Sequence, residues 1–185
     1  MTRDDATVLV CAGSRGGKTT FSMAMVNRGW RLIGDDKLLL GAPHGTWIVA
    51  GIKHVMNVDP VASAWFSELG DLTVLPEYSA WSPKRRVSLA SVWPAAAALQ
   101  GEPTHLVQLI RTEGRGEVKV SPLSIADRIS VLLHQTVIPL DPAIARHITS
   151  TLAVRAERLL GVRVEVPDDV YAQPHALDAV EEALR

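Results

Sequence analysis

The stretch that decides the fold of this chain is TVLVCAGSRGGKT, residues 7–19. Its first part, residues 7–11, is a short continuous run of apolar and β-branched side chains, which is typical of a strand buried on both faces. We expect this strand to be central in its sheet. Its second part, residues 12–19, is rich in glycine and small side chains and predicts a tight loop directly after the strand.

A helix is predicted to follow the loop. Phe21, Ala24 and Met25 recur at intervals that place them on one helix face. Gly29 interrupts the pattern as a C-terminal glycine does. We therefore expect a helix over Gly17–Arg28, which completes an arrangement of strand, glycine loop and helix.

The loop matches a phosphate-binding motif. Residues 12–19 have the spacing G-x-x-x-x-G-K-[ST], except that alanine replaces the first glycine. In such a loop, consecutive backbone N–H groups surround a phosphate at the positive N-terminus of the helix. Lys18 would bridge phosphate oxygens, and the Thr19 hydroxyl would join the shell of a Mg²⁺ ion. The sequence thus predicts a site for ATP and Mg²⁺ formed by Gly13, Ser14, Arg15, Gly16, Gly17, Lys18, Thr19 and Thr20.

Two other interpretations of the loop stay open. A glycine-rich turn with a solvated Lys18 would carry no function. The residues 12–16 also imitate the nucleophile elbow of an α/β-hydrolase, in which Ser14 would be the attacking residue. That fold needs strands before Thr7 and an Asp and a His downstream, and it would leave residues 17–19 unexplained. We therefore rank the hydrolase below the phosphate loop.

Composition and charge narrow the class of protein. The 185 residues are 47% hydrophobic and 21% charged, a mixture that predicts one globular domain over residues 1–185. The formal net charge is −1 and the charges are scattered, so we expect neither a nucleic-acid partner nor a membrane surface. The single cysteine, Cys11, cannot form an internal disulfide, which favours a reducing cytoplasm.

The remaining patterns indicate an α/β fold with a mixed β-sheet flanked by helices. Short β-rich runs bounded by turn residues predict further strands. These runs are Arg31–Ile33, Leu38–Leu40, Trp47–Ala50, Val55–Val58, His105–Ile110, Glu117–Val120 and Val162–Val166.

Two helices are expected before the last strand. Ser124 and Asp127 have the spacing of a capping box, and the helix that they begin should end near Pro139. The second helix is predicted to be the longest, beginning with Asp141 and Pro142 as N-cap and first-turn proline.

Apolar spacing predicts what these C-terminal helices bury. Ile144, Ile148 and Leu152 should form a buried stripe along the longest helix. Leu177, Val180 and Leu184 mark a closing amphipathic helix.

An acidic pair, Asp35 and Asp36, follows the first helix. Adjacent strand residues point to opposite faces, so both carboxylates can reach one site only if the backbone bends, and Gly34 allows such a bend. One carboxylate would hold Mg²⁺ while the other accepts the proton of an attacking hydroxyl. We favour Asp35 for the metal, together with Thr19, and Asp36 as the base. An ordinary polar turn is the alternative for the pair.

The loop, the helix, the run Arg28–Ile33 and the two aspartates together resemble the HPr kinase/phosphorylase superfamily. The resemblance is specific over residues 7–40 and weaker downstream. It implies a P-loop fold of the HPr-kinase-like type, with Lys18, Asp35 and Asp36 as catalytic residues. It also selects Lys53, Lys84 and Arg85 as contacts for the phosphate or the acceptor, although a short basic run is more often a solvated surface. Ala12 and Arg15 stand where this family usually has glycine.

These patterns lead to one expected function and one alternative from another class. We expect an ATP-dependent kinase that transfers the γ-phosphate to a serine or threonine hydroxyl of a peptide or small protein. The alternative is a non-catalytic ATP-binding module whose loops order for a partner protein. Relatives of this kind assemble, and an open sheet edge would suit a further copy of the chain, so a homo-oligomer is also expected.

Overall fold

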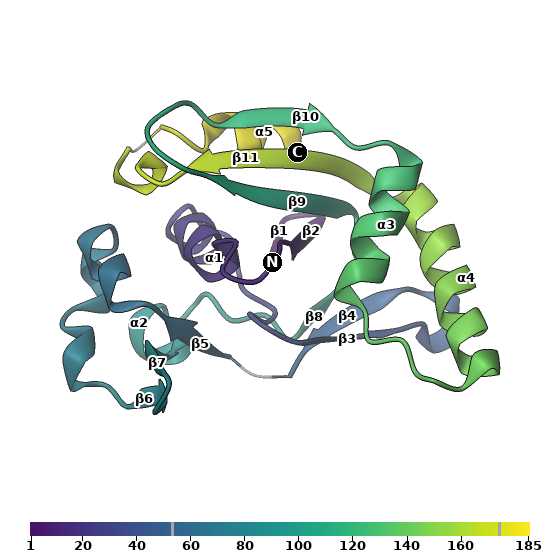
Figure 1. Cartoon of the computed structure of the whole chain (residues 1–185), viewed down its shortest axis with the longest axis horizontal. Coiled ribbons are helices and arrows are strands. Elements are labelled where there is room, and N and C mark those ends of the chain that lie inside the picture. The colour runs from purple at the N-terminus through teal and green to yellow at the C-terminus, as the bar shows by residue number, and fades with distance from the viewer. Residues whose placement is uncertain (53, 174) are drawn as a thin grey trace.

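The computed structural model describes residues 1–52, 54–173 and 175–185. Its main sheet has five strands, in the order β1-β2-β9-β11-β10. Figure 1 shows this sheet in the upper half of the molecule, with smaller sheets below it and two helices at one side. The strands are β1 (Thr2–Arg3), β2 (Ala6–Cys11), β9 (His105–Thr112), β11 (Leu160–Pro167) and β10 (Lys119–Pro122).

The main sheet is mixed, as predicted. β2 and β11 both run parallel to β9, whereas β1 and β10 are antiparallel to their neighbours. The strand predicted to be central, β2, lies beside the two-residue β1 at one end of the sheet. β9 is the central strand instead, because it pairs with long parallel strands on both sides.

Alternate side chains of the main sheet belong to two separate cores. Val8 and Val107 pack in one core with residues of α1 and with Val180 near the C-terminus. Their sequence neighbours Leu9 and Leu106 point to the other face and pack in the second core with residues of α3 and α4. The sheet is therefore covered on both faces, as its apolar strands require.

The helices are α1 (Lys18–Asn27), α2 (Leu89–Val92), α3 (Ile125–Gln135), α4 (Pro142–Arg158) and α5 (Asp178–Ala183). Four of the helices were predicted and follow the predicted order, whereas α2 was not predicted. The prediction for α1 is confirmed, with Gly29 in the left-handed region at φ 91° directly beyond its C-cap. The capping box that begins α3 and the aspartate cap of α4 are also present. α3 ends at Gln135, earlier than predicted.

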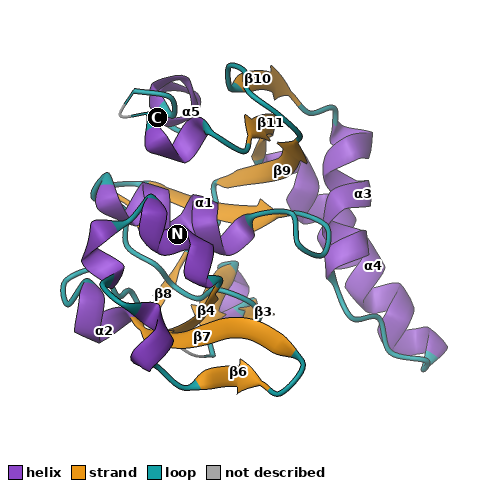
Figure 2. Ribbon diagram, turned by 60° about the vertical axis from the view of Figure 1, so that its left-hand side comes forward, coloured by secondary structure: helices purple, strands orange, loops and turns teal. Residues whose placement is uncertain are grey.

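The buried stripe predicted for α4 is wrong in its first half. Ile144 is 51% exposed, whereas Leu152 is 4% exposed and Ala156 is fully buried. Figure 2 shows the reason, since the N-terminal end of α4 extends away from the rest of the molecule. Helical spacing identifies an apolar face but cannot tell how much of its length has a neighbour.

The middle of the chain forms two smaller antiparallel sheets. One has the order β3-β4-β8, with β3 at Leu38–Gly41, β4 at Ile48–Gly51 and β8 at Gln100–Gly101. The other has the order β5-β7-β6. Its strands are β5 (Val55–Val58), β7 (Ser82–Ser88) and β6 (Glu77–Ser79).

One predicted strand is absent, and one observed strand was not predicted. Arg31–Ile33 forms no strand; Arg31 and Leu32 make isolated bridges to Thr2 and Ala97. Conversely, β7 was not predicted, because its prolyl and basic residues have the composition of a solvated run. The strand becomes stable through pairing with β5 and β6 on its two sides.

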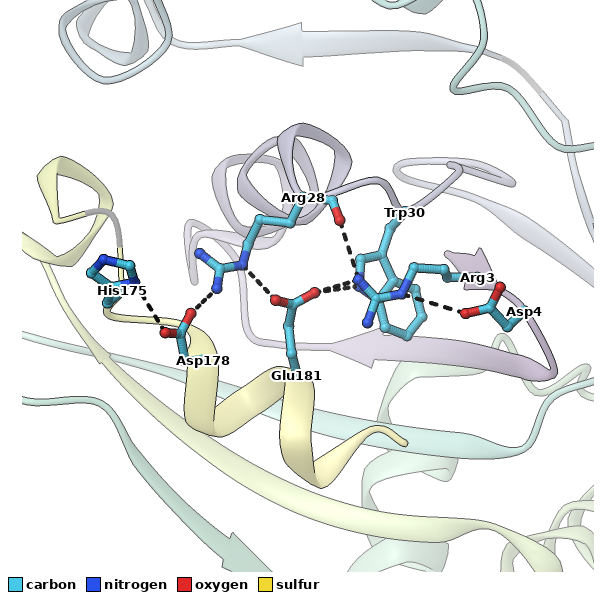
Figure 3. Close-up of polar contacts among 7 residues, drawn as sticks. All are labelled: Arg3, Asp4, Arg28, Trp30, His175, Asp178 and Glu181. Atoms are coloured by element: carbon cyan, nitrogen blue, oxygen red, sulfur yellow. Dashed lines mark hydrogen bonds and ion pairs between the residues drawn. The ribbon is translucent and has the colours of Figure 1, made fainter.

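A polar cluster ties the closing helix to the beginning of the chain, as Figure 3 shows. Glu181 of α5 accepts hydrogen bonds from Arg3 at 2.5 Å, Arg28 at 2.9 Å and Trp30 at 3.3 Å. Arg28 also pairs with Asp178. These contacts fix α5 beside the C-terminal end of α1. No helix in the described part of the chain is long and apolar enough to cross a membrane.

Candidate functional site

The glycine loop opens on a cleft of about 680 Å³ at the C-terminal ends of the parallel strands. This edge of an α/β sheet is the usual place for ligands. A smaller cavity of about 260 Å³ lies at the opposite ends of β2 and β9 and includes none of the predicted site residues. The larger cleft is therefore the candidate site. Residues 14–20 line it, together with Asp36, Lys84, Arg111, Asp168 and Tyr171 among others.

The shape of the loop depends on two glycines. Gly17 has φ 82°, a left-handed conformation that strongly favours glycine. A Cβ on Gly16 would lie 2.8 Å from the Cβ of Ala12 and 3.0 Å from the carbonyl oxygen of Gly13. Ala12 and Gly16 thus share a space that holds one methyl group. The departure of Ala12 from the motif is accommodated because residue 16 has no side chain.

The loop leads directly into the first turn of α1. Gly17 is the N-cap and supplies no side-chain cap, so the first N–H groups of the helix are not occupied by a capping side chain. Lys18 folds back over the loop, and its ammonium donates to the carbonyl oxygens of Ala12 at 2.9 Å and Gly13 at 3.1 Å. Backbone donors and an ammonium group therefore meet at the same place, as an anion site requires.

Thr19 and Asp35 are in direct contact. The Thr19 hydroxyl lies 3.0 Å and 3.1 Å from the two carboxylate oxygens of Asp35. Burial, with a smaller contribution from the charge of Asp36, raises the pKa of Asp35 to about 6 against the opposing effect of the Thr19 hydrogen bond. Asp35 is thus a partly buried carboxyl group next to the predicted metal-binding hydroxyl.

Asp36 lies on the cleft side of the bend. Its carboxylate is exposed, lines the cleft and accepts a hydrogen bond from the Asn57 amide at 3.3 Å. Glycine suits the position before the pair, because a Cβ on Gly34 would lie 2.8 Å from the Leu38 side chain and 3.2 Å from the Cα of Gly51. The two adjacent carboxylates therefore have different surroundings at one site.

The three basic residues selected downstream have different positions. Lys84, on β7, lines the cleft, and its charge acts on the Asp35 carboxyl. Arg85 does not line the cleft in the described structure; it forms an ion pair with Glu77 at 2.8 Å. Lys53 lies outside the described residues.

Sequence reasoning missed the far wall of the cleft. Arg111 and Asp168, just at or beyond the ends of β9 and β11, form an ion pair. The hydroxyl of Tyr171 lies 3.9 Å from the place of a Cβ on Gly17, and the ring of Trp65 lies 5.7 Å from that of Tyr171. No motif marks these residues. One signal in the sequence could have identified Arg111 and Asp168, since both are polar residues that follow predicted strands closely.

Among its described lining residues, the cleft offers no histidine partner for a hydrolase nucleophile at Ser14. Ser14 is exposed, and no histidine is among the described residues that line the cleft. Nor do the described residues include a group of three or more His, Cys, Asp or Glu side chains suited to a metal. A Mg²⁺ site does not need one, since this ion is usually held by one or two protein oxygens, water and phosphate.

Comparison with solved structures shows a distant structural similarity. The structure of the Hpr(Ser) kinase/phosphatase from Coxiella burnetii is similar to this chain with 13% sequence identity and a TM-score of 0.47. The alignment covers 98% of this chain and 86% of the other. No protein-family model matches the sequence, and no curated protein matches it.

Proposed function

We propose that this chain is an ATP-dependent kinase that transfers the γ-phosphate of ATP–Mg to a serine or threonine hydroxyl of a peptide or small protein. The observation that carries the proposal is the contact between Thr19 and Asp35, because it joins the end of the glycine loop to an acidic pair whose second member, Asp36, lines the same cleft as Thr19. The resemblance of residues 7–40 to the HPr kinase/phosphorylase superfamily supports the same assignment.

The donor set suits Mg²⁺. Thr19 and Asp35 supply hydroxyl and carboxylate oxygens, which are the hard ligands that this ion prefers. When bound there, Mg²⁺ would neutralise charge on the transferring phosphate. The burial that raises the pKa of Asp35 keeps this carboxyl poorly hydrated, so a cation beside it would stabilise its ionised form.

The other residues of the cleft have separate roles in the proposed reaction. The loop amides and Lys18 hold phosphate oxygens at the start of α1. Asp36, exposed on the cleft side and oriented by Asn57, accepts the proton of the attacking hydroxyl. Lys84, on β7, supplies positive charge to the cleft. Phosphoryl transfer of this kind depends mainly on positioning and charge rather than on covalent chemistry by the protein.

Calorimetric titration tests the nucleotide site. ATP is titrated with and without Mg²⁺ into the wild type, Lys18→Ala and a matched control, Lys37→Ala, whose side chain is exposed outside the cleft. We expect Mg²⁺-dependent binding in the wild type and the control and its loss in Lys18→Ala. Absence of ATP binding to the wild type would reject the proposal.

A labelling experiment tests transfer. The wild type is incubated with γ-labelled ATP and a degenerate library of serine and threonine peptides, and an alanine library serves as the acceptor control. We expect label in the hydroxyl library only, lost in Asp36→Asn and kept in Asp5→Asn, an exposed aspartate away from the cleft. If Asp36→Asn binds ATP and transfers label as well as the wild type does, Asp36 is not the base. Binding without any transfer by the wild type would indicate the non-catalytic module.

A further inference from the structure

Arg15 has an unusual backbone conformation for its residue type. It occupies the fourth position of the loop 12–19 with φ 59°, in the left-handed region. Among the described residues, the other non-glycine positions with positive φ are Asp4 and His44, residue types that enter this region more readily. For an arginine the conformation costs on the order of 1 kcal/mol, whereas glycine would adopt it freely. Such strain at a ligand-binding loop points to a use for the side chain.

The Arg15 guanidinium lies in the cleft without a protein partner among the described residues. It is exposed, lines the cleft and makes no hydrogen bond or ion pair with the other described residues. The other cations nearby differ: Lys18 donates to two loop carbonyls, and Arg111 is paired with Asp168. Lys84 stands on another wall, on β7.

The position of Arg15 in the loop separates it from the inner part of the anion site. The loop closes on itself through a hydrogen bond from the Gly16 amide to the Gly13 carbonyl at 3.1 Å, with Arg15 inside this turn. Lys18 and the first turn of α1 lie at the inner side, where backbone N–H groups meet a phosphate. A guanidinium on the exposed rim suits an outer phosphate of a nucleotide. Its planar fork can donate two hydrogen bonds to one phosphate.

We propose that Arg15 reads the terminal phosphate of a bound nucleoside triphosphate and so makes the site prefer the triphosphate over the diphosphate. This inference rests on the proposed nucleotide site and adds a residue that determines its specificity. The inner phosphates would remain held by the loop amides and Lys18, so the affinity for the diphosphate would not depend on the Arg15 side chain.

Titrations with a matched pair of nucleotides test the inference. Mg²⁺-loaded ADP and the β,γ-imido analogue of ATP are titrated into the wild type, Arg15→Gly and Arg15→Lys. The control is Arg115→Gly, the same substitution in an exposed segment between Gly114 and Gly116. Arg15→Gly relieves the backbone strain, so loss of the fold is not expected, and circular dichroism checks it.

We expect Arg15→Gly to weaken binding of the triphosphate analogue about tenfold, the effect of losing one charge-assisted contact. Binding of ADP should change less than about twofold, and Arg15→Lys should lie between the wild type and Arg15→Gly because it keeps the charge without the fork. An unchanged preference for the triphosphate, or an equal loss for both nucleotides, overturns the role of Arg15 while leaving the nucleotide site intact. A wild type that binds neither nucleotide overturns the proposed function and this inference together.

Discussion

The hydroxyl of Thr19 lies within hydrogen-bond distance of both carboxylate oxygens of Asp35, at 3.0 Å and 3.1 Å. This contact connects the first turn of α1 with the bend that follows Gly34. It also places a carboxyl group where burial raises its pKa to about 6. The pair therefore has a measurable effect on stability, whether or not a ligand is bound.

We predict that Asp35→Asn stabilises the metal-free protein near neutral pH. Because the pKa of Asp35 is raised in the folded state, its contribution to stability is fully present below the unfolded value of 3.8 and is lost as pH rises through about 6. Removing the ionisable group should thus gain at most about 3 kcal/mol at pH 7 and nothing at pH 3.5. Urea unfolding in a chelating buffer measures this, with Asp5→Asn as control. A gain that does not vary with pH would contradict the assignment.

We predict that Gly16→Ala damages the loop and that a second change partly repairs it. The added methyl group would lie 2.8 Å from the Cβ of Ala12 and 3.0 Å from the Gly13 carbonyl oxygen. The expected loss is about 1–3 kcal/mol, as for other overpacked sites. Ala12→Gly in the same chain removes the first contact but leaves the second, so part of the loss should return. Thermal unfolding of both single variants and the double variant measures the coupling between the two positions. Additive effects would disprove that residues 12 and 16 share one space.

We predict that Glu181→Gln destabilises the chain at pH 7 by about 1.5–3 kcal/mol, the range for hydrogen bonds to charged groups. Burial alone would raise the pKa of Glu181, but hydrogen bonds from Arg28 and Arg3 outweigh it and lower the pKa. Its contribution is therefore present above the unfolded value of 4.5 and is lost as pH falls through the lowered pKa. Urea unfolding at pH 7 and pH 3 should show the difference from wild type shrinking in acid. The exposed Glu182→Gln is the matched control, and an equal effect at both pH values would refute the mechanism.

We predict that the two halves of α4 respond differently to truncation. Leu152→Ala should cost about 2–5 kcal/mol, because Leu152 is 4% exposed and a cavity would remain. Ile144→Ala should change stability by less than about 1 kcal/mol, since the side chain is 51% exposed and alanine keeps the helix. Chemical unfolding of the two variants gives the comparison. A similar loss at both positions in the isolated chain would show that the N-terminal half of α4 is packed.

The sequence by itself determined the local elements whose signals are short-range. The strand β2, the glycine loop, α1, and the caps of α3 and α4 follow from backbone conformations and hydrogen bonds formed within a few residues. The α/β class with a mixed sheet also followed, since it requires only the order of such elements.

Only the tertiary structure decided which of these elements meet. β7 is stable because the distant strand β5 pairs with one side of it and the preceding strand β6 with the other, and Ile144 is exposed because no described residue covers the end of α4. The far wall of the cleft joins Arg111 and Asp168, which lie 57 residues apart. The same holds for Asp35, which contacts Thr19, while the adjacent Asp36 lines the cleft. The physical reason is that packing, pairing and desolvation depend on neighbours distant in sequence, which no local spacing specifies.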